Sequence, residues 1–250
     1  MSCGYSFDNA DHKVKDLLNR SAFQSHAAGT PYRRPVVFPS LTGNDVRIGY
    51  ELGLYDDETR FRVVEKGIAG KSQREYEFEF MRMMNRITGQ DKGFCDYCCM
   101  LTYGNIEDCH IGARSAYRSM FDLAYYDTCS TYSTIRRWLP FEAMTLKDGA
   151  PVMMTFVADY RQRFDCSNYA WLLDGYDAGR DARRRISTDH LDRKRFGNTR
   201  CVSEMMDMIA RLVGYIEDNG IRVDSAQIYN EGNQHATVMV FMDGVRCRRD

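Results

Sequence analysis

Apolar residues recur at helical spacing in three stretches of the chain, and each predicts an amphipathic helix. The first falls within residues 1–24, where Val14, Leu17 and Leu18 belong to a narrow apolar stripe. Residues 76–87 and 202–216 predict two further helices, which end near Gly-containing stops. Because the first stripe is narrow, we expect this helix to project and contact a neighbouring molecule, although docking on its own core is the alternative.

Alternating apolar and polar positions predict strands. The clearest one runs from Val46 to Leu54, and residues 59–66 are expected to return beside it as a hairpin. Further strands are expected at residues 120–126, 152–160, 221–229 and 235–242, whereas 161–198 look polar and irregular. Hairpins separated by helices favour an α+β fold over a parallel α/β sheet. Since no repeat or composition break is visible, residues 1–250 are interpreted as a single domain.

Composition narrows the class of protein. A chain of 250 residues with 44% hydrophobic residues can bury a large core, and no apolar run or leader-like start indicates a membrane or secretory protein, so we expect a cytoplasmic location. The nine cysteines are an odd number, which favours reduced thiols. A net charge of −1 argues against nucleic acid as a partner and favours self-association. The 27 Arg and 16 Tyr are typical of interfaces, although genomic base composition could also enrich Arg.

One cluster resembles a metal site, namely Cys95, Cys98 and Cys99 followed by Cys109 and His110. Zinc needs two well-spaced ligand pairs that converge tetrahedrally, and adjacent side chains such as Cys109 and His110 point in different directions. Structural thiols are therefore the favoured interpretation, and no metal is expected.

Two catalytic or phosphate-binding patterns are weak. Cys109 could be combined with His190 or His235 and with Asn233 into a thiol enzyme, but nothing local supports this grouping. The segment Gly67 to Ser72 ends like a P-loop without its glycine spacing, so a plain turn is favoured over an anion site at a helix N-terminus.

The segment from Arg180 to Arg200 is rich in basic residues. It could contact phosphates, which makes an RNA-binding or nucleotide-binding accessory protein the alternative function. A solvated loop with local Asp pairing, or a contact between copies, is equally compatible. The candidate anion contacts are Arg183, Arg184, Arg185, Arg193, Lys194 and Arg195.

Taken in order, the predicted elements resemble a cypovirus polyhedrin, the matrix protein of viral occlusion bodies. The resemblance rests on the N-terminal helix, a hairpin with the turn Tyr55-Asp56-Asp57, and a helix ending near Gly89. It continues with a Pro-Phe-Glu-Ala segment at 140–143 before a Lys-Asp-Gly turn, a late helix, and a closing strand near residues 233–235.

The resemblance implies an antiparallel β-sandwich flanked by helices, with an N-terminal helix that bridges molecules. It implies a structural protein rather than an enzyme, assembled with itself as trimers that pack into crystals in the cytoplasm of the infected host cell. Virus particles would be the cargo of these crystals. No cofactor is required under this interpretation, although nucleotides can occupy lattice sites in the family.

Occlusion crystals of this kind must dissolve at alkaline pH. Arg stays charged at pH 11, whereas Tyr, Cys and Lys lose protons near 10, 8.5 and 10.4, so a chain rich in Arg and Tyr would gain a large negative charge. The alkaline switch is assigned to Tyr125, Tyr126 and Tyr132, which cluster in one Tyr-rich stretch.

Overall fold

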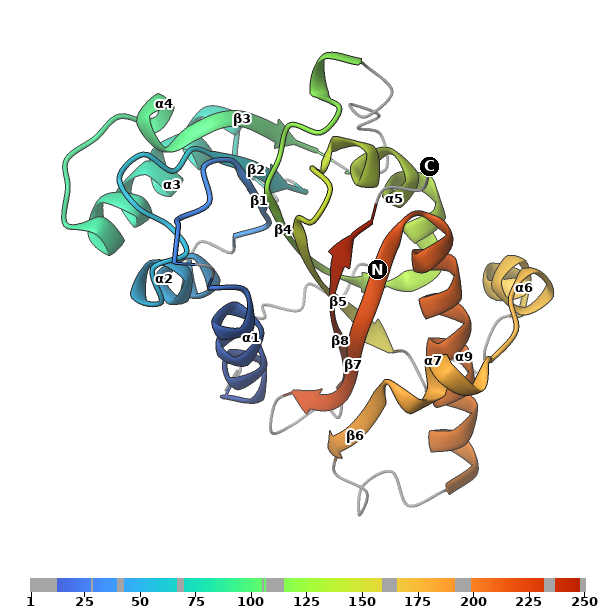
Figure 1. Cartoon of the computed structure of the whole chain (residues 1–250). Coiled ribbons are helices and arrows are strands. Elements are labelled where there is room, and N and C mark those ends of the chain that lie inside the picture. Colours follow the sequence, from blue (N-terminus) through green and yellow to red (C-terminus); the bar gives the residue numbers. More distant parts are fainter. Residues whose placement is uncertain are drawn as a thin grey trace.

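Eight strands form one mixed sheet in the order β3-β2-β1-β4-β5-β8-β7-β6 (Figure 1). The computed structural model describes residues 13–27, 29–39, 43–66, 70–104, 106, 115–158, 166–191, 199–231 and 237–247. The strands are β1 (Pro35–Val37), β2 (Phe61–Glu65), β3 (Cys98–Tyr103), β4 (Leu123–Thr131), β5 (Pro151–Ala158), β6 (Ile186–His190), β7 (Ile221–Glu231) and β8 (Thr237–Arg246). The helices are α1 (Lys13–His26), α2 (Asn44–Glu51), α3 (Gln73–Thr88), α4 (Phe94–Tyr97), α5 (Ile135–Thr145), α6 (Cys166–Gly175), α7 (Arg180–Arg184) and α9 (Thr199–Asp218).

The strand order reverses between β1 and β4. From this point, β1, β2 and β3 follow one another toward one end of the sheet, and β4 and β5 follow one another toward the other end. These five strands are parallel, whereas β8 is antiparallel to both β5 and β7. This is a doubly wound arrangement with a topological switch point between β1 and β4. Every strand except β8 ends at the same side of the sheet, which we call the carboxyl edge; the opposite side is the amino edge.

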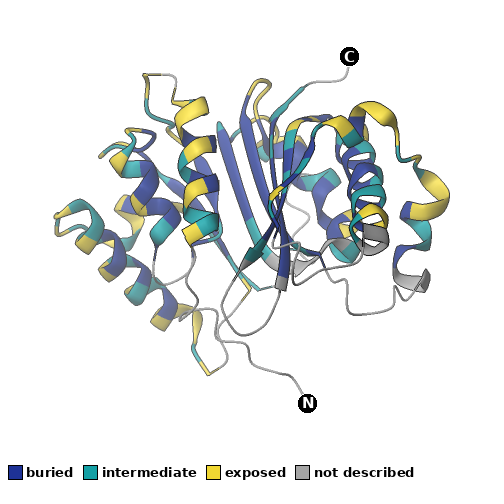
Figure 2. Ribbon diagram, turned by 90° about the horizontal axis from the view of Figure 1, so that it is seen from below, coloured by how far each residue is buried: buried dark blue, intermediate teal, exposed yellow. Residues whose placement is uncertain are grey.

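Helices cover both faces of the sheet, as the chain direction requires. Right-handed crossovers place the helices between β1, β2 and β3 on one face and the helix between β4 and β5 on the other. Helices α1, α2 and α3 share one apolar cluster with the sheet, and α5, α6 and α9 share another. Figure 2 shows the mostly buried strands in dark blue between these two layers of helices.

Helix α1 crosses the sheet from the carboxyl edge to the amino edge. The Tyr125 hydroxyl of β4 donates to the side-chain oxygen of Asn19 at 3.1 Å, and the Phe23 ring meets the Tyr125 ring edge-on at 5.9 Å. His26 lies 2.6 Å from the carboxylate of Asp243 in β8. The predicted first helix is therefore present and packs on the sheet of its own chain. Of its predicted assembly residues, Leu18 is buried, Val14 is half-buried and Leu17 is exposed.

Several sequence predictions are confirmed by these elements. Helix α3 begins with a capping box between Ser72 and Glu75 and ends at Gly89, which has a left-handed backbone. Helix α9 and strands β7 and β8 also lie where the apolar periodicity placed them.

The predicted strand from Val46 to Leu54 is wrong, because these residues belong mainly to α2. In a pattern with an apolar residue at every second position, every second apolar residue is four positions away. Val46 and Tyr50, or Ile48 and Leu52, therefore share a side of a helix as well. The predicted hairpin is absent from the described chain, and β2 pairs in parallel with β1. The stretch expected to be irregular contains α6, α7 and β6.

The predicted antiparallel β-sandwich is also wrong. Parallel strands covered on both faces read as continuous apolar runs instead of alternating ones. Strand β5 illustrates this, since seven of its eight residues are buried. The antiparallel pairing expected throughout occurs only where β8 lies between β5 and β7 in the described sheet.

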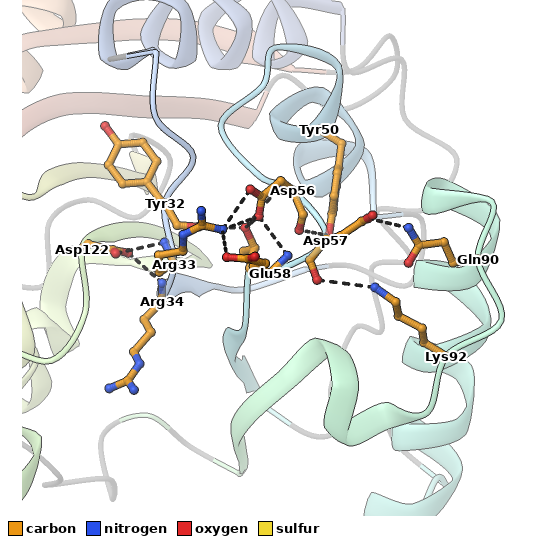
Figure 3. A network of polar contacts seen from close by, with 11 residues as sticks. Tyr32, Arg33, Arg34, Tyr50, Asp56, Asp57, Glu58, Gln90, Lys92 and Asp122 are labelled. Atoms are coloured by element: carbon orange, nitrogen blue, oxygen red, sulfur yellow. Dashed lines mark hydrogen bonds and ion pairs between the residues drawn. The ribbon is translucent and has the colours of Figure 1, made fainter.

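A polar network holds the amino edge together (Figure 3). The backbone amides of Arg33 and Arg34, which precede β1, donate to the carboxylate of Asp122 before β4 at 3.0 and 2.9 Å. Nη1 of the Arg33 guanidinium donates hydrogen bonds to both carboxylate oxygens of Asp56, at 2.8 and 2.9 Å. These contacts fix where β1 begins relative to β2 and β4.

A buried ion pair joins β2 to α5 on the other face. Arg62 and Glu142 are both fully buried, and Nη2 of Arg62 donates to Oε1 of Glu142 at 2.8 Å. The Tyr126 hydroxyl donates to the same carboxylate at 3.3 Å, and the Phe121 ring lies 5.4 Å from the guanidinium carbon. Because the pair reaches from β2 past β1, it ties the two halves of the sheet together.

Removing one partner of this pair should be far costlier than removing both. We expect Glu142→Ala to lower the free energy of unfolding by about 3–5 kcal/mol, because the Arg62 charge stays buried without its partner. The double variant Arg62→Met with Glu142→Leu should lose less than the single one, as measured by urea unfolding. Arg47→Ala, which breaks an exposed pair on α2, is the control and should shift the midpoint little. Equal losses in the single and double variants would contradict the account.

Candidate functional site at the carboxyl edge

Strand β1 stops earlier at the carboxyl edge than the strands on either side of it. Its last residue, Val37, pairs with Val63 of β2 and with Tyr125 of β4. Glu65 and Asp127 each lie two residues further along these strands, so they share the face that α1, α2 and α3 cover. Two acidic residues therefore flank the switch point, which is where doubly wound sheets bind their ligands.

Asp127 is held by two donors from distant parts of the chain. The ammonium of Lys15, from α1, and the hydroxyl of Thr155, from the neighbouring strand β5, both donate to its carboxylate. The side chains of Lys15 and Asp127 are only 15% and 11% exposed. Helix α1 thus delivers a positive charge to the end of β4.

The turn from β1 into α2 is built on Gly43. Its φ of 61° is left-handed, and a Cβ at this position would lie 2.4 Å from Sδ of Met83 in α3. The left-handed backbone favours glycine, and a Cβ here would require the Met83 side chain to shift. At the start of the helix, Asn44 is joined to α1 by a 2.5 Å hydrogen bond from its amide to Asp16.

Asp45 follows in the first turn of α2 and is only 8% exposed. Its Oδ2 has no hydrogen-bond partner among the described residues. Burial raises the pKa of Asp45 to about 7, with a further contribution from the charge of Asp127 that Lys15 partly offsets. The carboxyl group is therefore near its titration midpoint at neutral pH.

A second buried polar group at this edge lacks a partner. Tyr76 of α3 is fully buried, and its hydroxyl makes no hydrogen bond within the described part of the chain. Burial raises the pKa of Tyr76, and the charges of Glu65 and Asp45 add to this effect. Buried atoms of Gln90, Trp171 and Arg183 also lack a partner among the described residues, so it is the position of Asp45 and Tyr76 beside the switch point that favours a site completed by a ligand.

The turn between β1 and α2 does not suit a dinucleotide. The dinucleotide fingerprint has three glycines that let the backbone approach a pyrophosphate, whereas residues 38–45 contain Gly43 alone. Asp45 also places a carboxyl group at a helix N-terminus, where a phosphate would otherwise be favoured. Glu65 nevertheless lies about 20 residues beyond this turn at the end of β2, the position from which an acidic residue contacts ribose hydroxyls in this fold.

None of these residues was singled out from the sequence. The available signals were the apolar residues Phe61, Val63 and Val64 just before Glu65, and the apolar stretch before Asp127. An acidic residue at the end of a buried strand becomes a site candidate only when the strand order is known.

The predicted alkaline-switch tyrosines lie inside the protein where they are described. Tyr125 and Tyr126 are fully buried between the sheet and its helices. Burial and the neighbouring Glu142 raise the pKa of Tyr126. The side chain of Tyr132 lies outside the described residues.

The predicted anion contacts are partly described. Arg183, Arg184 and Arg185 each pair with an acidic side chain of this chain, at 2.5, 3.4 and 2.5 Å. Arg193, Lys194 and Arg195 lie outside the described residues. Each described arginine therefore has an acidic partner in this chain, although Nε of Arg183 has no hydrogen-bond partner among the described residues. These arginines lie where β6 begins, which is the amino edge of the sheet.

The cysteine cluster forms no metal site among the described residues. Cys98 is buried, whereas Cys95 and Cys99 are exposed, and Cys109 and His110 lie outside the described residues. No helix in the described part of the chain is long and apolar enough to cross a membrane.

No protein-family model matches the sequence, and neither does any curated protein sequence. Solved structures do match the fold. A putative hemolysin from Streptococcus thermophilus has a TM-score of 0.51 at 13% identity, covering 96% of this chain and 68% of its own. M. jannaschii TYW2 in complex with AdoMet has a TM-score of 0.46 at 9% identity, covering 94% of this chain and 76% of its own. A Burkholderia thailandensis 1,6-didemethyltoxoflavin-N1-methyltransferase with bound S-adenosylhomocysteine has a TM-score of 0.48 at 10% identity, covering 95% of this chain and 84% of its own.

These findings correct the interpretation as a polyhedrin. The mostly parallel sheet contradicts that family, and with it the function as an occlusion-body matrix protein. The expectations of a non-enzyme that requires no cofactor rested on that resemblance and are overturned with it. The alternative of an RNA-binding or nucleotide-binding accessory protein gains no better support. The resemblance rested on the order and length of the predicted elements without a specific motif, and this is too weak a basis for assigning a family.

The burial of Asp45 predicts a pH-dependent stability. The folded chain keeps its proton up to about pH 7, whereas the unfolded chain releases it near 3.8, so this group makes the protein less stable as pH rises between these values. Asp45→Asn removes that loss. We expect the difference in melting temperature, variant minus wild type, to grow between pH 5 and 8. Asp57→Asn, at an exposed carboxylate on the amino edge, is the control. A difference that stays constant with pH would rule out a buried, titrating Asp45.

Proposed function

We propose that this chain is a methyltransferase that binds S-adenosylmethionine (AdoMet) at the carboxyl edge, between the ends of β2 and β4. The observation that carries the proposal is the switch point itself, where β1 ends early and leaves Glu65 and Asp127 on either side. Ligands of doubly wound sheets bind at this position.

The residues at this edge suit a nucleoside without phosphates. Glu65 would accept hydrogen bonds from the ribose hydroxyls, and the sequence before α2 lacks the three-glycine fingerprint of pyrophosphate-binding turns. AdoMet carries an adenosine without a phosphate, together with positively charged groups that the acidic residues here favour. When bound, it supplies an electrophilic methyl group on a sulfonium centre.

The remaining polar residues lie on the β4 and β5 side of the switch point. Lys15, Asp127 and Thr155 form one connected group there, so we assign them to the side of the acceptor. Lys15 can donate a hydrogen bond to an approaching acceptor, and Thr155 keeps the carboxylate of Asp127 oriented. Residues 13–26 thereby contribute to the site as well as to the core.

Binding of AdoMet to the full chain tests the proposal, and isothermal titration calorimetry measures it. We expect saturable binding of AdoMet and none of NAD at the same concentration, because the sequence before α2 lacks the three-glycine fingerprint. Glu65→Gln should weaken AdoMet binding by about tenfold to a hundredfold, which is what one charge-assisted hydrogen bond contributes.

The matched control is Glu58→Gln, at an exposed carboxylate on the amino edge, and it should bind AdoMet like the wild type. Absence of AdoMet binding to the folded wild type would overturn the proposed function. Equal losses in the two variants would show that Glu65 does not contact the cofactor.

A further inference from the structure

Among the described residues, the group around Asp45 contains one positive charge for two carboxyl groups. Lys15 lowers the pKa of Asp45 through its charge, and it donates a hydrogen bond to Asp127. Asp127 also accepts the Thr155 hydroxyl, so it has two donors, whereas Oδ2 of Asp45 has none among the described residues. Within the described part of the chain, Asp45 is therefore the carboxyl group of this pair whose oxygen lacks a donor.

The surroundings of this carboxyl group are apolar and buried. Tyr76 is fully buried, and the charge of Asp45 contributes to its raised pKa, after the larger effect of burial. A buried carboxylate that lacks a partner is stabilised when a positively charged ligand pairs with it. A hydrated metal ion would need several oxygen ligands, and no group of three acidic, His or Cys side chains is suitably placed among the described residues.

The other charged groups described at this site supply no donor to this oxygen of Asp45. From α1, Asp16 is engaged by the amide of Asn44 at 2.5 Å. From β2, Glu65 adds negative charge, which contributes to the raised pKa of Tyr76. Burial raises the pKa of the Cys98 thiol of β3 to about 12, so it remains neutral.

We propose that Asp45 recognises a positively charged centre of the cofactor, which pairs with the buried carboxylate oxygen that lacks a partner among the described residues. The inference rests on the proposed function and names the contact that makes the site selective for a cationic nucleoside. On binding, the carboxyl group gives its proton to the buffer and its carboxylate pairs with the ligand cation. Oδ2 gains its missing partner, and the site gains its second positive charge.

This exchange makes binding depend on pH. Below about pH 7 the ligand must displace a proton, and above it the carboxylate is already free. Affinity for a cationic ligand should therefore rise with pH up to about 7 to 8 and then level off. Near pH 6 binding should release close to one proton, which calorimetry detects as a dependence of the heat on the buffer.

Three nucleosides that differ in their charged groups show which cationic group of the ligand contacts Asp45. AdoMet carries both a sulfonium and an ammonium, S-adenosylhomocysteine carries only the ammonium, and methylthioadenosine carries neither. We expect Asp45→Asn to weaken binding of at least AdoMet by about tenfold or more at pH 7.5 and to leave methylthioadenosine unchanged. A loss for both AdoMet and S-adenosylhomocysteine assigns the contact to the ammonium, and a loss for AdoMet alone assigns it to the sulfonium.

Asp57→Asn is the matched control and should bind all three nucleosides like the wild type, with melting curves confirming that both variants fold. If the wild type binds AdoMet and Asp45→Asn binds it equally well, the inference is overturned while the proposed function stands. Binding of AdoMet to the wild type without release of a proton at pH 6 would overturn the inference in the same way. If the folded wild type binds none of the three nucleosides, the proposed function fails first.

Discussion

Strand β1 is three residues long and lies between two strands that continue beyond it, and the site depends on this difference in length. Its start is fixed because Asp122 binds the backbone amides of Arg33 and Arg34. Beyond Val37 the chain turns toward α2, whose first residues are placed by Gly43 against Met83. The ends of β2 and β4 therefore have no strand between them, and their acidic residues face the ends of the covering helices.

The two edges of the sheet distribute their charges differently. At the amino edge, each carboxylate of the Figure 3 network is matched with a guanidinium, an amide or a backbone donor, so the network is structural. At the carboxyl edge, three helices bring Lys15, Asp45 and Tyr76 toward strand ends that carry further acidic groups, and two polar atoms lack partners among the described residues. Unpaired groups that would be costly in a purely structural region are understandable where a ligand completes them.

The sequence predicted local structure better than it predicted topology. Helices α3 and α9 could be located because their apolar stripes end at glycine, and β7 and β8 because apolar runs flank a turn. Helix α2 could not, since its alternation of apolar residues fits a strand and a helix alike. The parallel sheet was missed because fully buried strands such as β5 carry no alternation. The site was missed for a topological reason. Lys15, Asp45, Glu65 and Asp127 come from four different elements, and only the strand order shows that these elements meet.

Hydrogen–deuterium exchange of the full chain, with and without saturating AdoMet, tests the central claim most directly. A ligand at the switch point should slow exchange in peptides that cover residues 43–51 and 61–66, because it orders the start of α2 and the end of β2. Peptides covering residues 52–60, at the amino edge, should exchange at the same rate in both samples. Protection confined to the amino edge, or none at either edge under conditions where AdoMet binds, would contradict a cofactor site between β2 and β4.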